Sequence, residues 1–280
     1  MEKLLLVDGS NLLFQMFYGM PARILNRQGK PIQGTLGFVG ALLKMIRMVQ
    51  PTAVAVLFDG ECHNDRTDID ENYKANREDF SQMDKDDTPF SQMPDVYRAL
   101  DYMGICHGET TVCETDDWMA AYCCRHGAET EIVIASQDSD FFQLIGENVT
   151  VLRYRGDNSV LCDEAYIQEK LGIEPGRYAD FKSLTGDTAD NIRGADKVGP
   201  KTAAWLLQEF GDLESILTRA EEITKPSIRA SILQNAESLR RNYKLISLTG
   251  EVAVPFAPEQ LTYQYDGLTT TQVLTAIGVR

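Results

Sequence analysis

Acidic side chains follow three apolar runs of the sequence at the points where those runs end. Asp8 and Asp59 come directly after their runs, and Asp138 and Asp140 come just after the third. Carboxylate oxygens are the ligands that Mg²⁺ prefers in proteins. Two such ions about 4 Å apart are a common device for hydrolysing phosphodiesters, because both stabilise the charge that gathers on the phosphate. The pattern therefore predicts a metal-assisted phosphodiester hydrolase.

Five further acids extend this set. Glu114, Asp116 and Asp117 lie in the first turn of a predicted helix, and Asp187 and Asp190 lie three residues apart in G-D-T-A-D-N. Taken singly, such residues are ordinary first-turn acids, N-caps or turn residues. Nine converging carboxylates would repel one another by roughly 4 kcal/mol per close pair. Divalent cations relieve that repulsion, so the complete set favours a metal site.

The apolar runs themselves predict the elements that position these acids. They are short and continuous, as in buried parallel strands, and helical patterns lie between them. Because sites in open parallel sheets form at the carboxyl ends of the strands, three strands deliver acids to one edge. The predicted strands are Leu4–Val7, Ala53–Phe58, Ile132–Ala135 and, more weakly, Val149–Leu152; the predicted helices are Thr35–Val49, Pro94–Met103 and Asp116–His126.

The alternation of strands and helices predicts an α/β fold with a mainly parallel central sheet flanked by helices. We expect this core over residues 1–174, a helical module over 175–250, and a C-terminal segment over 251–280 that packs on the core. Residues 78–95 are polar and acidic and contain two prolines, which indicates a long excursion between elements.

The bulk properties exclude several classes of protein. The chain has 280 residues, 43% of them hydrophobic, and a net charge of −15, which is unusual for a general nucleic-acid binder. The first apolar run is too short for a signal peptide or a membrane span. Six cysteines without C-x-x-C spacing and three scattered histidines argue against disulfides and zinc. We therefore expect a cytoplasmic monomer without a membrane association.

The motifs together resemble the bacterial 5′-nuclease family, which comprises flap endonucleases and the 5′→3′ exonuclease domain of DNA polymerase I. Their order and spacing cover the chain to about residue 250, and the chain stops where the polymerases continue, which favours a stand-alone form. The matching segments are D-G-S-N-L-L-F at Asp8–Phe14, F-D-G at Phe58–Gly60, Y-K-A-N-R at Tyr73–Arg77, E-T-D-D at Glu114–Asp117, Q-D-S-D at Gln137–Asp140, G-D-T-A-D-N-I at Gly186–Ile192 and V-G-P-K-T-A-A at Val198–Ala204.

The resemblance implies two metal clusters and two basic residues that contact the scissile phosphate. It implies Mg²⁺ as the cofactor, with Mn²⁺ as a substitute. Lys74 and Arg77 match the residues that contact the phosphate, where both charges suit a developing dianion. The first cluster would comprise Asp8, Asp59, Glu114, Asp116 and Asp117, and the second Asp138, Asp140, Asp187 and Asp190.

The segment Gly194–Leu207 resembles the helix–hairpin–helix-like element with which this family holds duplex DNA. Gly199, Lys201 and Thr202 would lie at phosphates, and the family often holds K⁺ in this element through backbone carbonyls. Asp196-Lys197 stands where the family has Pro-Gly. A P-loop is excluded because Pro200 shifts the lysine out of register and no buried strand precedes it.

Three basic residues leave two interpretations open. Arg240, Arg241 and Lys244 lie on one predicted helix and either contact phosphates or form a solvated face. The stretch 78–95, where the family has an arch over the active site, carries six acids against one lysine, which disfavours a DNA strand there.

We expect a structure-specific 5′-nuclease acting on DNA with a 5′ flap, a nick or a 5′ end. Two alternatives remain. A PIN-like metal-dependent ribonuclease would cleave single-stranded RNA without needing the Lys201 region. A DNA-junction binding protein with weak catalysis would bind DNA without cutting it, and its binding would survive Asp140→Asn.

Overall fold

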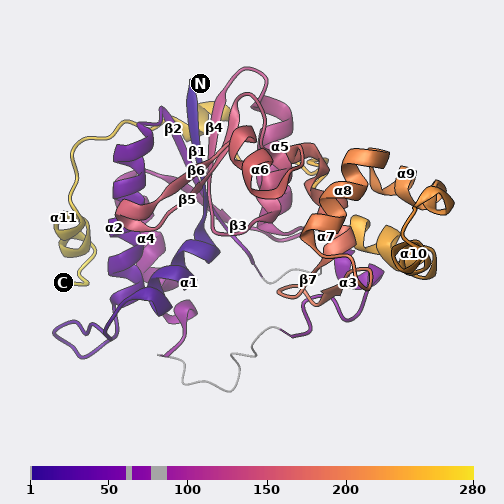
Figure 1. The fold of residues 1–280 in the computed structure, drawn as a ribbon. Coiled ribbons are helices and arrows are strands. Elements are labelled where there is room, and N and C mark those ends of the chain that lie inside the picture. The colour runs from indigo at the N-terminus through magenta and orange to yellow at the C-terminus, as the bar shows by residue number, and fades with distance from the viewer. Residues whose placement is uncertain (1, 61–64, 77–86) are drawn as a thin grey trace.

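The computed structural model describes residues 2–60, 65–76 and 87–280 of the chain (Figure 1). A six-stranded sheet with the order β3-β2-β1-β4-β5-β6 forms its centre, and every neighbouring pair is parallel except β5 and β6. This confirms the predicted fold class. The strands are β1 (Lys3–Asp8), β2 (Ala53–Phe58), β3 (Cys106–Glu109), β4 (Glu131–Ala135), β5 (Val149–Arg153) and β6 (Val160–Cys162).

Alternate residues of the central strands enter two separate hydrophobic cores. Leu4 and Leu6 of β1 face one core, whereas Leu5 and Val7 face the other, and all four are fully buried. Both faces of a sheet are apolar only when helices cover both, as in parallel α/β folds. Helices α2 and α4 cover one face, and α5 covers the other. The helices of this half are α1 (Gly9–Gly19), α2 (Gln33–Val49), α3 (Asp65–Ile69), α4 (Met93–Met103), α5 (Thr115–His126) and α6 (Glu164–Leu171).

A group of helices follows α6 and extends from one side of the sheet, in orange in Figure 1. The long helix α10 packs against α7 and α9, and a two-stranded hairpin, β7–β8, leads from α7 toward α8. These elements are α7 (Tyr178–Thr185), β7 (Gly186–Asp187), β8 (Ile192–Arg193), α8 (Pro200–Phe210), α9 (Leu213–Thr218) and α10 (Pro226–Ile246).

The C-terminal segment returns across the sheet domain. The Tyr122 hydroxyl of α5 donates to the Phe256 carbonyl at 3.0 Å, and Thr262 forms a bridge with Ala53 of β2. The last helix, α11 (Thr270–Ala276), packs against α2 and α4 (Figure 1). Within the described residues, every helix is too short or too polar to cross a membrane.

Most of the expected elements are present, and the differences have local causes. Helix α1 was not predicted, because β1 runs directly into it and its N-cap, Asp8, was interpreted only as a metal ligand. Strands β3 and β6 were missed because both are short and mostly incompletely buried. Of the expected excursion over 78–95, residues 78–86 lie outside the described part. Asp95 belongs to α4 instead, where it is 4% exposed and pairs with Arg98.

Candidate metal centre

Asp8, Asp59 and Asp138 meet at the carboxyl edge of three adjacent strands. β1 lies between β2 and β4 in parallel register, so the three strand ends are neighbours. Asp8 caps α1, because its Oδ1 accepts from the Asn11 amide at 2.9 Å. Its Oδ2 accepts from the Ser136 hydroxyl at 2.8 Å, and that hydroxyl accepts from the Asp138 amide at 3.0 Å. One serine therefore joins the ends of β1 and β4.

Glycine follows two of these acids because the backbone has no room for a side chain. A Cβ on Gly9 would lie 2.5 Å from the buried Phe58 ring. A Cβ on Gly60 would lie 2.1 Å from the Thr110 carbonyl oxygen. The D-G pairs therefore let each acid stand at the strand end while the chain turns away close to its neighbour.

The start of α5 adds acids to this edge. The Thr115 amide donates to Asp59 Oδ1 at 2.9 Å, which fixes the helix N-terminus beside β2. Burial raises the pKa of Asp116 well above its ordinary value, and the charges of Asp138, Asp8 and Asp59 raise it further. Asp116 therefore faces the strand-end acids. The first acid group comprises Asp8, Asp59, Glu114, Asp116 and Asp138. Asp138 was expected in the second cluster, but Ser136 joins it to Asp8 at the strand ends.

A second acid group consists of Asp140, Asp187 and Asp190. One carboxylate oxygen of each lies within 4.8 Å of the others. Asp140 begins a short 3₁₀ helix after β4, and the other two come from the hairpin that follows α7. Burial and the charge of Asp138 raise the pKa of Asp140 to about 7. The second group is thus continuous with the first through Asp138.

Lys182, on α7, supplies a buried positive charge to the second group. Its Nζ lies 2.9 Å from Asp140 Oδ1 and donates to Asp187 Oδ2. Burial alone would lower the pKa of this ammonium, but the two carboxylates raise it above its usual value. The sequence reading missed Lys182. The sequence did contain an indication of its role: Lys182 stands among apolar residues, between Phe181 and Leu184, and five positions before Asp187.

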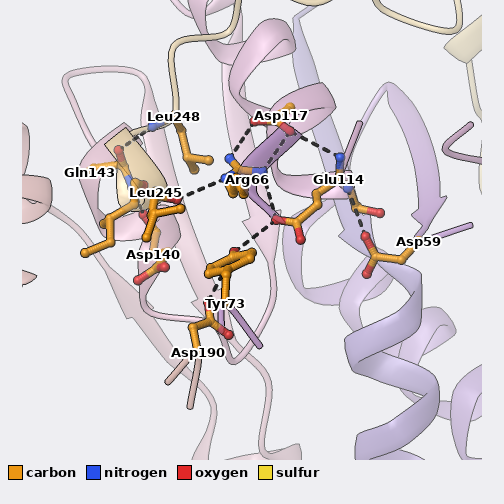
Figure 2. Close-up of polar contacts among 12 residues, drawn as sticks. Asp59, Arg66, Tyr73, Glu114, Asp117, Asp140, Gln143, Asp190, Leu245 and Leu248 are labelled. Atoms are coloured by element: carbon orange, nitrogen blue, oxygen red, sulfur yellow. Dashed lines mark hydrogen bonds and ion pairs between the residues drawn. The ribbon is translucent and has the colours of Figure 1, made fainter. Parts of the chain in front are cut away.

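The turn that carries Lys74 connects the two groups. Lys74 Nζ lies 2.5 Å from Glu114 Oε1, and its backbone amide donates to the Asp190 carbonyl at 3.1 Å. The Tyr73 hydroxyl lies 3.3 Å from Glu114 Oε2 and 3.5 Å from Asp190 Oδ2 (Figure 2). Arg77 lies outside the described residues.

Asp117 contacts Glu114 of the first acid group, but Arg66 holds its carboxylate, so it does not lie among the strand-end acids. Both of its oxygens accept from Arg66 of α3, at 2.8 and 3.0 Å, and one also accepts from the Glu114 amide (Figure 2). Its role as a metal ligand stays a prediction. Sequence reading also missed Arg66, although it is the one arginine or lysine between Asp59 and Lys74.

The donor set fits divalent metal ions. All its members are carboxylates, the ligands that hard cations such as Mg²⁺ prefer. Burial and neighbouring carboxylates raise the pKa of Asp8 and of Asp140, the latter despite Lys182, so a divalent cation bound there would favour their charged forms. A metal bound there would supply charge neutralisation and Lewis-acid chemistry.

The residues expected to contact DNA lie at two places, the start of α8 and the second half of α10. Gly199 is the N-cap of α8, and Lys201, in the first turn, is exposed beside the partly exposed Thr202. The preceding Lys197 has a φ of 64°, the left-handed region that glycine favours, which is where the family has glycine.

The basic residues of α10 are largely engaged by acids. Arg240 pairs with Glu214 at 2.7 Å, and Arg241 Nε lies 3.2 Å from Asp70. Lys244 is exposed and lines a cavity of about 360 Å³ with Arg177 and Asp212. Their contact with DNA stays a prediction.

Two family models match nearly the whole chain. The model "5′-3′ exonuclease, N-terminal resolvase-like domain" matches residues 3–172, and "5′-3′ exonuclease, C-terminal SAM fold" matches residues 173–267. The chain belongs to the 5′-3′ exonuclease family. Among individual 5′-3′ exonucleases, the Aquifex aeolicus protein is 31% identical over 93% of this chain and 86% of its own length. The family assignment therefore agrees with the resemblance carried by the motifs.

Other members of the 5′-3′ exonuclease family are longer. DNA polymerase I of Rhizobium leguminosarum is 35% identical over 90% of this chain, which spans only 25% of that polymerase. Among solved structures, the flap endonuclease of bacteriophage T5, in a pseudo-enzyme–product complex with DNA and metal ions, superposes with a TM-score of 0.73. It is 20% identical and covers 99% of this chain and 94% of its own. At that identity the likeness shows a shared fold.

Replacing Asp8 by asparagine should stabilise the metal-free protein. Burial and the charge of Asp59 raise the pKa of Asp8 to about 7, against about 3.9 in an unfolded chain. The folded state thus binds the proton more tightly, so this group lowers stability as the pH rises from about 4 to about 7. The difference amounts to roughly 4 kcal/mol.

Asparagine keeps the oxygen that caps α1 but carries no charge. We expect Asp8→Asn to melt at a higher temperature than the wild type at pH 8 in chelator, with a smaller difference at pH 4. Thermal denaturation measures both. An equal or lower melting temperature at pH 8 would contradict the assignment.

Replacing Lys182 by methionine should make the fold depend on added metal. The change leaves Asp140 and Asp187 without their buried partner, which costs about 3–5 kcal/mol. The repulsion between Asp140 and Asp187 is then stronger than in the wild type, so Mg²⁺ bound beside them stabilises the variant more. We expect a lower melting temperature in chelator and a larger rise on adding Mg²⁺ than in the wild type. Equal rises in both proteins would show that the lysine and the metal do not share these acids.

Proposed function

We propose that the chain is a metal-dependent, structure-specific 5′-nuclease that hydrolyses DNA phosphodiesters at 5′ flaps, nicks and 5′ ends. The observation that carries this proposal is the convergence of the two acid groups at one edge of the sheet, with Lys74 at their junction. An all-carboxylate site suits Mg²⁺ or Mn²⁺ and phosphate-ester chemistry.

Two sets of residues would have different roles, one binding the metal ions and the other binding the phosphate. The two acid groups would bind the divalent ions, and Lys74, with Arg77, would contact the scissile phosphate. The Lys74 ammonium lies at the acids, 2.5 Å from Glu114 Oε1, so it would be placed to pair with a phosphate bound beside them. Asp8 and Ser136 would keep two strand ends in register.

The second part of the proposal places duplex DNA at the start of α8. An exposed helix N-terminus presents backbone amides to phosphates without reading bases. Gly199, Lys201 and Thr202 would form this contact, and backbone carbonyls of the turn 194–199 would hold K⁺. The T5 flap endonuclease, which shares the fold, is seen with DNA and metal ions. The net charge of −15 makes such a localised contact necessary.

Cleavage should be flap-selective, require metal and depend on Asp138. Labelled 5′-flap, nicked and single-stranded oligonucleotides are incubated with Mg²⁺, Mn²⁺ or chelator. Because Asp138 adjoins both acid groups, we expect Asp138→Ala to reduce the rate by at least about 100-fold. Glu131→Ala is the matched control, because Glu131 lies at the opposite end of the same strand, β4.

Three results would count against the proposal. Undiminished cleavage by Asp138→Ala would refute the site. Cleavage of single-stranded RNA in preference to flap DNA would favour the ribonuclease alternative. Tight junction binding without wild-type cleavage, retained in Asp140→Asn, would favour a binding protein.

Lys201→Ala should weaken duplex binding equally for all sequences, because a phosphate contact carries no base information. The slope of log affinity against log salt should fall by about one. Fluorescence anisotropy at several salt concentrations measures this, with Lys3→Ala, at the amino end of the central strand β1, as the control. An unchanged slope would place the duplex elsewhere.

A further inference from the structure

The last turn of α10 is held by two side chains of the sheet domain. Arg66 Nε donates to the Leu245 carbonyl at 2.9 Å. Gln143 Nε2 donates to the Ile246 carbonyl at 3.0 Å, and Gln143 Oε1 accepts from the Leu248 amide at 2.8 Å (Figure 2). The final carbonyls of a helix lack partners within the helix. Here two side chains from different elements satisfy them.

The other end of Arg66 holds the start of α5. Its Nη1 lies 2.8 Å from Glu114 Oε2, and its Nη2 lies 2.8 Å from Asp117 Oδ1. The arginine is 8% exposed, so these charge-assisted bonds are shielded from water. The planar guanidinium reaches all three acceptors at once, which a lysine cannot do. One side chain therefore spans the end of α10 and the acids at the α5 N-terminus.

Gln143 makes the corresponding connection to the second acid group. The same Nε2 that reaches α10 donates to the Asp140 carbonyl at 2.9 Å. Gln143 belongs to the 3₁₀ helix that Asp140 begins. The end of α10 is thus connected to the backbone of Asp140 as well as to the Glu114 side chain.

The same part of α10 is also bonded toward the DNA-binding segment. Asn242, one turn earlier and 4% exposed, donates through Nδ2 to the carbonyls of Arg193 at 2.9 Å and Ser183 at 3.2 Å. Arg193 ends β8, directly before the turn 194–199 that leads to Gly199. A shift of that turn would displace the end of α10, which is bonded to Arg66 and Gln143.

We propose that Arg66 and Gln143 are positioning residues that couple the C-terminal turn of α10 to the two acid groups. DNA held at the α8 N-terminus and divalent metal at the acids then strengthen each other's binding, and the effect is reciprocal. The negative end of the α10 dipole beside the Arg66 guanidinium strengthens this connection. The inference rests on the proposed function, because it assigns metal to the acids and DNA to the N-terminus of α8.

Hydrogen exchange tests the coupling without DNA or catalysis. The Leu248 amide donates to Gln143, so its exchange reports the state of the connection. In the wild type, added Mg²⁺ should slow exchange in the last turn of α10 and at Leu248. In Arg66→Lys this response should be lost, because lysine lacks the guanidinium that bonds Leu245, Glu114 and Asp117 at the same time. A wild-type segment that does not respond to Mg²⁺ would overturn the coupling.

Binding measurements supply the second test. Affinity for a 5′-flap duplex is measured by anisotropy in chelator and in Ca²⁺, and the ratio of the two affinities is the coupling. We expect Arg66→Lys and Gln143→Met to reduce this ratio by about 5-fold or more while the chelator affinity stays within 2-fold of the wild type. In the same two variants, the Mg²⁺ concentration that gives half-maximal cleavage should be higher than in the wild type.

The matched control is Arg98→Lys, because Arg98 of α4 likewise joins an acid, Asp95, to a carbonyl at the end of a helix, that of Ile277 after α11, and touches neither acid group. It should leave the ratio and the exchange response as in the wild type. A merely structural role for Arg66 would lower melting temperature and chelator affinity with the ratio unchanged, which would overturn the proposal. Gln143→Met retains the test if Arg66→Lys does not fold.

Failure of the proposed function would look different. A wild type that cuts no DNA at any Mg²⁺ concentration, yet shows the exchange response, would refute nuclease activity while leaving the coupling of α10 to the acids supported.

Discussion

Repulsion among carboxylates at one edge of the sheet is the constraint on which the rest of this structure depends. Parallel strands must end side by side, so the acids that follow β1, β2 and β4 come close together. Burial makes their charge still harder to maintain, as the raised pKa values of Asp8, Asp116 and Asp140 show. Such a cluster persists only where positive charge balances it.

Among the described residues, three such charges come from elements far apart in sequence. Arg66 comes from α3, Lys74 from the turn after it, and Lys182 from α7, and each lies within 3 Å of an acid at the site. These ion pairs hold the metal-free protein together. A metal ion would replace the basic side chain as partner of a carboxylate, and a phosphate would replace the carboxylate as partner of a basic side chain. The fold gives up stability there in exchange for a site that responds to ligands.

The same pairs also join the parts of the molecule. Lys182 links α7 to the 3₁₀ helix after β4, and Arg66 links α3 to α5 and α10. Removing any of these charges would therefore affect both the arrangement of the acids and the contact between the helices and the sheet. Structural and chemical roles cannot be assigned to separate residues here, because the same bonds serve both.

Periodicity was enough to predict four of the six strands and the acids at their ends, because buried strands are continuous apolar runs in the sequence and the acids follow them directly. Arg66, Lys182 and Gln143 could not be found in this way. A base or an amide within a helix looks the same in sequence whether it faces solvent or a buried carboxylate. Only the packing of α3, α7 and the 3₁₀ helix against the acids distinguishes the two.

The sequence by itself determined the chemistry of the site: which residues carry carboxylates, and that strand ends present them. The tertiary structure decided which acid faces which partner. Asp116 and Asp117 are neighbours in sequence, yet successive helix positions point about 100° apart. Asp116 therefore lies among the strand-end acids, whereas Asp117 is held by Arg66. That choice depends on the rotation of α5 against the sheet and on the place of α3, which no local pattern specifies.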